Sequence, residues 1–127
     1  MAKIAIVGAG SMVFCKTLIA DVLNSALKDV EFCLMDLNEQ KLEWSRQYAE
    51  RLIRANDLPA CVTATTNRRE ALKDADYVIL TFHIGGLQTI VQDYEIPMKH
   101  GVDQCIGDTL APGGIFRALR VIPVVLD

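Results

Sequence analysis

The stretch that decides the fold is residues 1–14, which read MAKIAIVGAGSMVF. Residues 3–7 form a continuous apolar run that ends at a glycine, which is typical of a parallel strand buried on both faces. Gly8 and Gly10 follow at the spacing of the dinucleotide-binding signature, but Val13 stands where that signature has its third glycine. Ser11 is predicted to cap a helix that runs to about residue 25.

The rest of the chain repeats this order of strand and helix. Further strands are predicted over residues 30–35, 61–65 and 77–82, and further helices over residues 38–56, 67–73 and 87–100 and from Gly114 onward. This alternation predicts an α/β fold: a Rossmann-like, doubly wound parallel sheet with helices on both faces. Ligands of such sheets bind beyond the carboxyl ends of the strands. The candidate positions are therefore residues 8–12, Asp36, residues 82–86 and the loop near Asp108.

The first loop has the chemistry that a dinucleotide requires. Gly8 allows a sharp turn out of the strand, and Gly10 lets the backbone approach a pyrophosphate without an intervening Cβ. The helix N-terminus at Ser11 is expected to offer N–H donors and the positive end of the helix dipole. Val13 is expected only to widen the distance between this helix and the strand, so phosphate contact stays possible.

Asp36 closes the second predicted strand, where an acidic residue can accept hydrogen bonds from ribose hydroxyls. A carboxylate there would repel a 2′-phosphate, which favours NAD over NADP. The alternative is a tight strand-to-helix turn in another kind of α/β domain, with Asp36 capping the next helix.

A second polar, glycine-rich loop covers residues 103–114, DQCIGDTLAPGG, and leads into a helix. Gly113 and Gly114 at the helix start could expose N–H groups to an oxygen-rich ligand. Asp108 could then hydrogen-bond a substrate hydroxyl or transfer a proton. Turn formation or helix capping explains Asp108 equally well.

Two histidines near these loops have weaker functional interpretations. His100, Cys105 and Asp108 are spaced too loosely for a closed zinc site. His83, at the end of the fourth predicted strand, could line the nucleotide site, but it is more readily explained as a bystander.

Composition excludes several classes of partner. The net charge is −3 and the basic residues are scattered, which argues against nucleic acid or an anionic membrane surface. No apolar run approaches the roughly 20 residues of a membrane span. The four cysteines form no CxxC pair, which indicates buried, reduced thiols in a cytoplasmic protein; they are Cys15, Cys33, Cys61 and Cys105. Residues 115–127 form an apolar helix without a stop signal, so we expect the chain to be the N-terminal part of a longer protein.

Four stretches together resemble glycoside hydrolase family 4: GAGSMVF, LMDLNEQKLE, FHIGG and IPMKHGVDQCIGDTLAPGGIFRALRVIP. The resemblance is strongest to the α-galactosidase branch, with α-galacturonidases and α-glucuronidases nearby. Ala111 departs from the glycine usual in the family, which leaves the shape of this loop open. Residues 88–92 carry no arginine, whereas the branch that hydrolyses phosphorylated sugars tends to have one there, so a 6-phosphorylated substrate is disfavoured.

The resemblance implies hydrolysis of an α-glycoside by oxidation, elimination, addition and reduction, with NAD and a divalent metal, usually manganese. The family's metal ligands and catalytic base would lie beyond residue 127, so residues 1–127 are expected to be an NAD-binding domain that is inactive alone. By the same resemblance the full-length protein would be a homo-oligomer. The residues that match family positions are Gly8, Gly10, Ser11 and Met12 in the dinucleotide loop, Asp36 as the ribose acid, Thr81 beside the cofactor and Asp108 as an acidic residue near the scissile bond.

Two other functions stay open at this point. A 2-hydroxy-acid dehydrogenase of the lactate or malate kind would need an arginine after the fourth strand, and residues 85–94 contain none. A non-catalytic NAD-sensing module would need no sequence beyond this domain.

Overall fold

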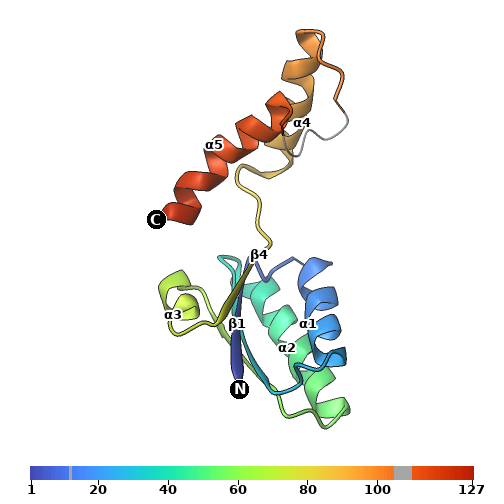
Figure 1. Ribbon diagram of the computed structural model, residues 1–127, viewed down its shortest axis with the longest axis vertical. Helices are drawn as coiled ribbons and strands as arrows, with labels where there is room; N and C mark the ends of the chain where they lie inside the picture. The colour runs from blue at the N-terminus through green and yellow to red at the C-terminus, as the bar shows by residue number, and fades with distance from the viewer. Residues whose placement is uncertain (12, 105–109) are drawn as a thin grey trace. The chain divides into compact units, whose positions relative to one another are not determined.

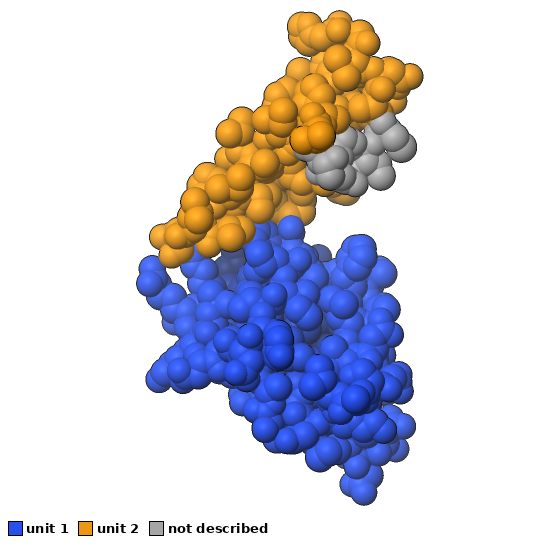
Figure 2. Space-filling view, viewed as in Figure 1, with its two compact units in different colours: residues 1–82 blue, residues 83–127 orange. Residues whose placement is uncertain are grey.

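The computed structural model describes residues 1–11, 13–104 and 110–127. They divide into two compact units, residues 1–82 and residues 83–127 (Figure 2). The first unit holds β1 (Ala2–Val7), α1 (Phe14–Asn24), β2 (Val30–Met35), α2 (Glu39–Ala55), β3 (Cys61–Thr65), α3 (Arg68–Leu72) and β4 (Tyr77–Leu80). The second unit holds α4 (Gly86–Lys99) and α5 (Pro112–Leu126).

The first unit is a parallel sheet with the strand order β3-β2-β1-β4. Helices α1 and α2 cover one face of the sheet, and α3 covers the other (Figure 1). The chain therefore places β2 and β3 on one side of β1, and it then crosses over to place β4 on the other side. This arrangement confirms the predicted Rossmann-like sheet with helices on both faces.

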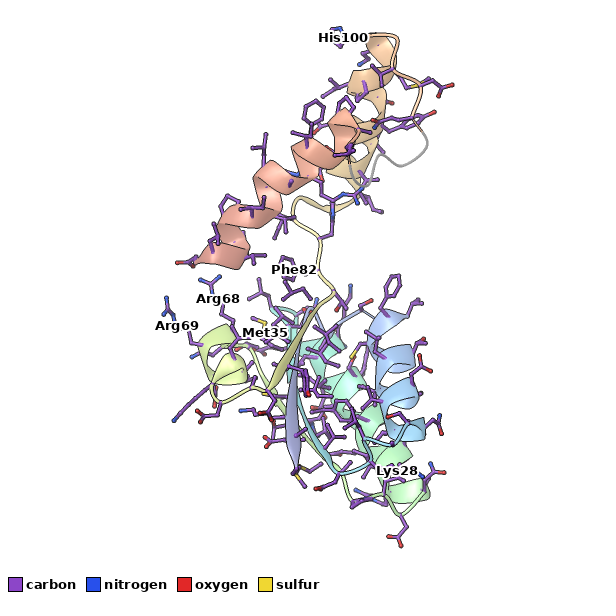
Figure 3. The ribbon with its side chains drawn as sticks, viewed as in Figure 1. Lys28, Met35, Arg68, Arg69, Phe82 and His100 are labelled. Carbon is purple, nitrogen blue, oxygen red and sulfur yellow. The ribbon has the colours of Figure 1, made fainter. Side chains whose placement is uncertain are left out.

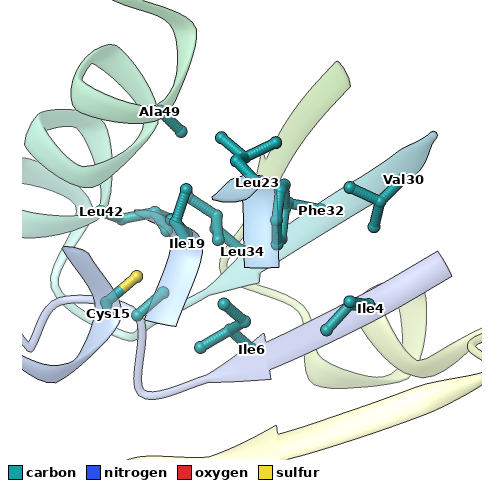
Figure 4. Packing of buried hydrophobic residues seen from close by; sticks show 11 residues of the cluster. Ile4, Ile6, Cys15, Ile19, Leu23, Val30, Phe32, Leu34, Leu42 and Ala49 are labelled. Atoms are coloured by element: carbon teal, nitrogen blue, oxygen red, sulfur yellow. The ribbon is translucent and has the colours of Figure 1, made fainter. Parts of the chain in front are cut away.

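Two apolar layers hold the sheet between its helices, because successive side chains of a strand point to opposite faces. On one face Ile6 and Phe32 pack in a cluster with Ile19 of α1 (Figure 4). On the other face Cys33 packs with Ala71 of α3. Strand β2 is thus buried on both sides, which explains its continuous apolar sequence.

Two of the predicted helix caps are present. The side chain of Asn38 accepts a hydrogen bond from the Lys41 amide at 3.0 Å, and that of Asn67 accepts one from the Arg69 amide at 3.0 Å. These bonds satisfy amide groups that have no partner within their own helices, so they fix where α2 and α3 begin.

A buried ion pair joins the two helices of the second unit. Arg120 of α5 donates to both carboxylate oxygens of Asp93 in α4, at 2.9 and 2.5 Å, and Asp93 is only 2% exposed. The helices are also in close contact at Gly113, where a Cβ would lie 2.5 Å from the backbone oxygen of Asp93. A glycine is therefore required at the start of α5.

The cysteines only partly follow the expectation of buried thiols. Cys15 and Cys33 are buried and free, but Cys61 is exposed, so the expectation was wrong for this residue. Cys61 begins β3, which is an edge strand of the sheet. Cys105 lies outside the described residues. Among the helices that the structure describes, none is long and apolar enough to cross a membrane.

Phe32→Ala is expected to lower the free energy of unfolding by about 3–5 kcal/mol, because it removes a fully buried ring and leaves a cavity. Phe14→Ala is the matched control, since Phe14 is 66% exposed, and its effect should stay within about 0.5 kcal/mol. Urea denaturation followed by circular dichroism measures both. Equal losses for the two variants would contradict the place of Phe32 in the core.

Candidate nucleotide-binding site

Three of the predicted site residues lie directly after three neighbouring strands of the sheet, β2, β1 and β4. Gly8 follows β1, Asp36 follows β2 and Thr81 follows β4. The register pairs the last residue of β1 with the last residues of β2 and β4, so all three positions emerge at the same edge. The strand order reverses between β1 and β4, and this is the point at which open α/β sheets bind their ligands.

Gly8 and Thr81 tie the ends of β1 and β4 together. The Thr81 amide donates to the Val7 carbonyl at 2.8 Å, and the Thr81 hydroxyl donates to the Gly8 carbonyl at 2.9 Å. Gly8 has a φ of +91°, and a Cβ there would lie 2.7 Å from the backbone carbonyl of Thr81. A side chain at position 8 is therefore excluded both by backbone conformation and by contact.

Gly10 and Asp36 form a hydrogen bond that joins the ends of β1 and β2 in the same way. The Gly10 amide donates to Asp36 Oδ2 at 2.8 Å, and the Asn38 amide donates to Asp36 Oδ1 at 2.8 Å. A Cβ at position 10 would lie 2.7 Å from Asp36 Oδ2, so only glycine allows this approach. Each carboxylate oxygen can accept a second hydrogen bond, so Asp36 keeps capacity for ribose hydroxyls.

The start of α1 differs from the prediction. Ser11 does not cap the helix: α1 begins at Phe14, the N-cap is Val13, and no side chain caps it. The Ser11 amide instead donates to the Gly8 carbonyl at 3.1 Å within a turn. Because Ser11 is part of this turn, the helix begins later in the chain than predicted. Met12 lies outside the described residues.

This shift changes which amides could bind phosphate. The amides of Gly8 and Ala9 both donate to the Met35 carbonyl, at 2.8 and 2.9 Å, and those of Gly10 and Ser11 are also engaged within the protein. Among the described residues, the amides of Val13 and Phe14 donate no hydrogen bond. Donors of this kind at a helix N-terminus are suited to an anion.

Val13 does not separate the helix from the sheet. Its side chain is 70% exposed, whereas the contact between α1 and the sheet is made by buried residues that begin at Cys15. The expected widening of the helix-to-strand distance therefore has no structural basis.

Ser45 contacts the candidate loop, and the sequence analysis did not single it out. It lies on the buried face of α2, and its hydroxyl donates to the Ala9 carbonyl at 2.6 Å. The one available signal was a serine between Leu42 and Ala49 on the apolar stripe of α2. Beside it, burial raises the pKa of the Cys15 thiol to about 11, against the opposing effect of the Ser45 hydroxyl. Cys15 is therefore a neutral thiol at pH 7.

The second predicted loop is described only at its ends, because Asp108 lies outside the described residues. Gly113 does not offer an open amide as predicted: it is buried and donates to Gln104 Oε1 at 3.4 Å.

His83 is exposed, and its Nε2 lies 3.0 Å from the hydroxyl of Thr89. Within residues 1–11, 13–104 and 110–127, no three His, Cys, Asp or Glu side chains could hold a metal together. Figure 3 shows the described side chains, with Met35 labelled at the end of β2.

Comparisons with known proteins place this chain in a sequence family. The sequence profile of the family 4 glycosyl hydrolases matches residues 3–127. The chain is 51% identical over 126 residues to an alpha-galactosidase of Rhizobium meliloti, covering 98% of this chain and 26% of that enzyme. It is 40% identical over 129 residues to an alpha-galactosidase of Bacillus subtilis, covering 100% of this chain and 30% of that enzyme. The chain thus spans only 26–30% of the length of these relatives.

Solved structures agree with this result. A 6-phospho-beta glucosidase from Thermotoga maritima, with manganese, NAD+ and glucose-6-phosphate, matches with a TM-score of 0.80 at 28% identity, over 99% of this chain and 30% of that chain. A 6-phospho-alpha-glucosidase from gut microorganisms, in complex with NAD and glucose-6-phosphate, matches with a TM-score of 0.78 at 28% identity, over 98% of this chain and 28% of that chain. The sequence match and the fold therefore lead to one conclusion: this chain belongs to the family 4 glycosyl hydrolases.

Proposed function

We propose that residues 1–127 are the NAD-binding part of a glycosidase, and that the whole protein hydrolyses α-galactosides. The observation that carries the first half is the convergence of Gly8, Asp36 and Thr81 where the strand order reverses. The second half is supported by the 51% and 40% identity to two alpha-galactosidases.

The described residues fit a dinucleotide in three respects. Asp36 presents a carboxylate whose orientation is fixed by two backbone amides, and which can still accept from ribose hydroxyls. Gly10 leaves the loop without a Cβ at the point where the carboxylate approaches. The amides of Val13 and Phe14 would bind the pyrophosphate at the N-terminus of α1. Met12 and Thr81 would complete the lining of this site.

Bound NAD would supply a hydride acceptor for oxidation of the sugar ring. The described residues would contribute binding and orientation: Asp36 holds the adenosine ribose, and the tie between Gly8 and Thr81 keeps the loop beside the end of β4. Asp108 would donate or accept a hydrogen bond near the scissile bond. By the family resemblance, the metal ligands would lie beyond residue 127.

The choice of an unphosphorylated galactoside rests on α4. Two solved relatives contain glucose-6-phosphate, which an enzyme usually binds with a cationic side chain. Helix α4 carries no arginine, and its one cationic residue is Lys99 in the last turn. Gln88 and Gln92 occupy the stretch in which the phosphate-binding branch tends to carry a base, so residues 88–92 offer no cationic side chain to pair with a phosphate.

The Asp36 carboxylate should make the protein prefer NAD, because the 2′-phosphate of NADP would meet a like charge. We expect NAD to bind at least about tenfold more tightly than NADP by isothermal titration calorimetry, and Asp36→Asn to narrow that ratio. Asp57→Asn is the matched control, since Asp57 is exposed and its φ of +48° is tolerated by asparagine. Equal affinities of the unmodified protein for the two nucleotides would remove the argument.

Gly10→Ala should weaken NAD binding about tenfold or more, because the new Cβ would displace the Asp36 carboxylate. If the effect acts through the contact between the new Cβ and the Asp36 carboxylate, Gly10→Ala should raise the Kd for NAD much less when Asp36 is already alanine. A double-mutant cycle by calorimetry measures this coupling. Fully additive losses would show that position 10 acts independently of Asp36.

The full-length protein, supplied with NAD and Mn²⁺, should hydrolyse nitrophenyl α-galactoside faster than the matching α-glucoside, α-galacturonide or 6-phospho-α-glucoside. Removal of NAD, or of the metal with EDTA, should abolish turnover. Spectrophotometric release of nitrophenol measures all four substrates. Faster turnover of the phosphorylated substrate would refute the argument from α4, and unchanged turnover without NAD would refute the proposed mechanism.

A further inference from the structure

One buried hydroxyl reaches the dinucleotide loop from a distant part of the sequence. Ser45 lies in the second turn of α2 and is 0% exposed. Its Oγ donates to the Ala9 carbonyl at 2.6 Å, across 36 residues of sequence. Ala9 is also 0% exposed, so its carbonyl cannot turn to solvent for another partner.

The same peptide unit is held at its other end by Asp36. The peptide between Ala9 and Gly10 is trans, so its carbonyl and its amide point in opposite directions. The carbonyl accepts from Ser45 at 2.6 Å, and the amide donates to Asp36 Oδ2 at 2.8 Å. These two bonds together determine the plane of the peptide.

Gly10 makes such restraint necessary. A glycine has access to more backbone conformations than any other residue, so a peptide next to it can rotate at little steric cost. Rotation of the Ala9–Gly10 peptide by half a turn would direct a carbonyl oxygen, in place of an N–H, at the Asp36 carboxylate. The Ser45 hydroxyl opposes that rotation, because it donates to the carbonyl and because both residues are fully buried, so that water cannot replace the bond.

We infer that Ser45 is a positioning residue for the nucleotide: it fixes the Ala9–Gly10 peptide so that Asp36 is held in the one orientation that can receive the ribose. The inference rests on the proposed binding of NAD. The restraint on the Ala9–Gly10 peptide does not depend on NAD, because it rests only on the hydrogen bonds with Ser45 and Asp36.

The test compares Ser45→Ala with Ala49→Gly in the intact protein. Both changes remove one buried heavy atom from the same face of α2, but only Ser45 has a side-chain hydrogen bond to the loop for the change to remove. Ser45→Ala should raise the Kd for NAD about tenfold and speed hydrogen exchange across residues 8–11 about tenfold. Ala49→Gly should lower the melting temperature but leave both the Kd and the loop exchange unchanged. Calorimetry and hydrogen-exchange mass spectrometry give the two measurements.

Ser45→Thr separates positioning from stability. It keeps the hydroxyl but adds a methyl group at a fully buried position, so the melting temperature should fall while the Kd for NAD stays within about threefold of the unmodified protein. If Ser45→Ala leaves both the Kd and the loop exchange unchanged, or if Ser45→Thr weakens binding as much as Ser45→Ala, the inference is wrong. If the unmodified protein binds no NAD, the proposed function fails, and the exchange rates alone still decide whether Ser45 fixes the peptide.

Discussion

The hydrogen bond from the Gly10 amide to the Asp36 carboxylate joins the end of β1 to the end of β2, and the candidate site depends on it. The bond can form because the parallel register places Val7 opposite Met35, so the residues that follow emerge at one edge. It also needs a residue without a Cβ at position 10. A carboxylate held by two amides has lost most of its rotational freedom before any ligand arrives, which reduces the entropy that binding must overcome.

The two glycines of the loop serve different contacts within the protein. Gly8 lets the backbone at Thr81 come close, and it adopts a φ of +91°. Gly10 lets a carboxylate come close. Both requirements arise from the way the chain connects its own strands, in addition to any approach of a pyrophosphate. The junction of the three strands therefore by itself requires both glycines.

The sequence predicted the sheet, and the positions of three candidate residues at its edge, because both depend on local signals. Alternating apolar runs and caps such as Asn38 locate the strands and helices, and Gly8, Asp36 and Thr81 sit directly after strands. The start of α1 was wrong because Ser11 has the residue type of a cap, while a turn closed by the Gly8 carbonyl decides where its amide goes.

Ser45 was missed for a different physical reason. Its partner is the carbonyl of Ala9, and no side-chain pattern in the sequence reports where a backbone carbonyl will point. The exposure of Cys61 likewise reflects the strand order, since β3 lies at the edge of the sheet and has a neighbouring strand on one side only. Contacts that join distant segments through backbone groups therefore cannot be predicted from the sequence pattern and are found only in the three-dimensional structure.

The hydrogen bonds of the loop also explain why a valine is acceptable in place of the third glycine. The amides of residues 8–11 donate to acceptors within the protein, so in the proposed site a phosphate would bind amides closer to the helix. The N–H of Val13 is a backbone group that any residue except proline supplies equally well. Its side chain is 70% exposed and enters neither the helix–sheet contact nor the ties between strands. No contact within the described residues therefore requires a glycine at position 13.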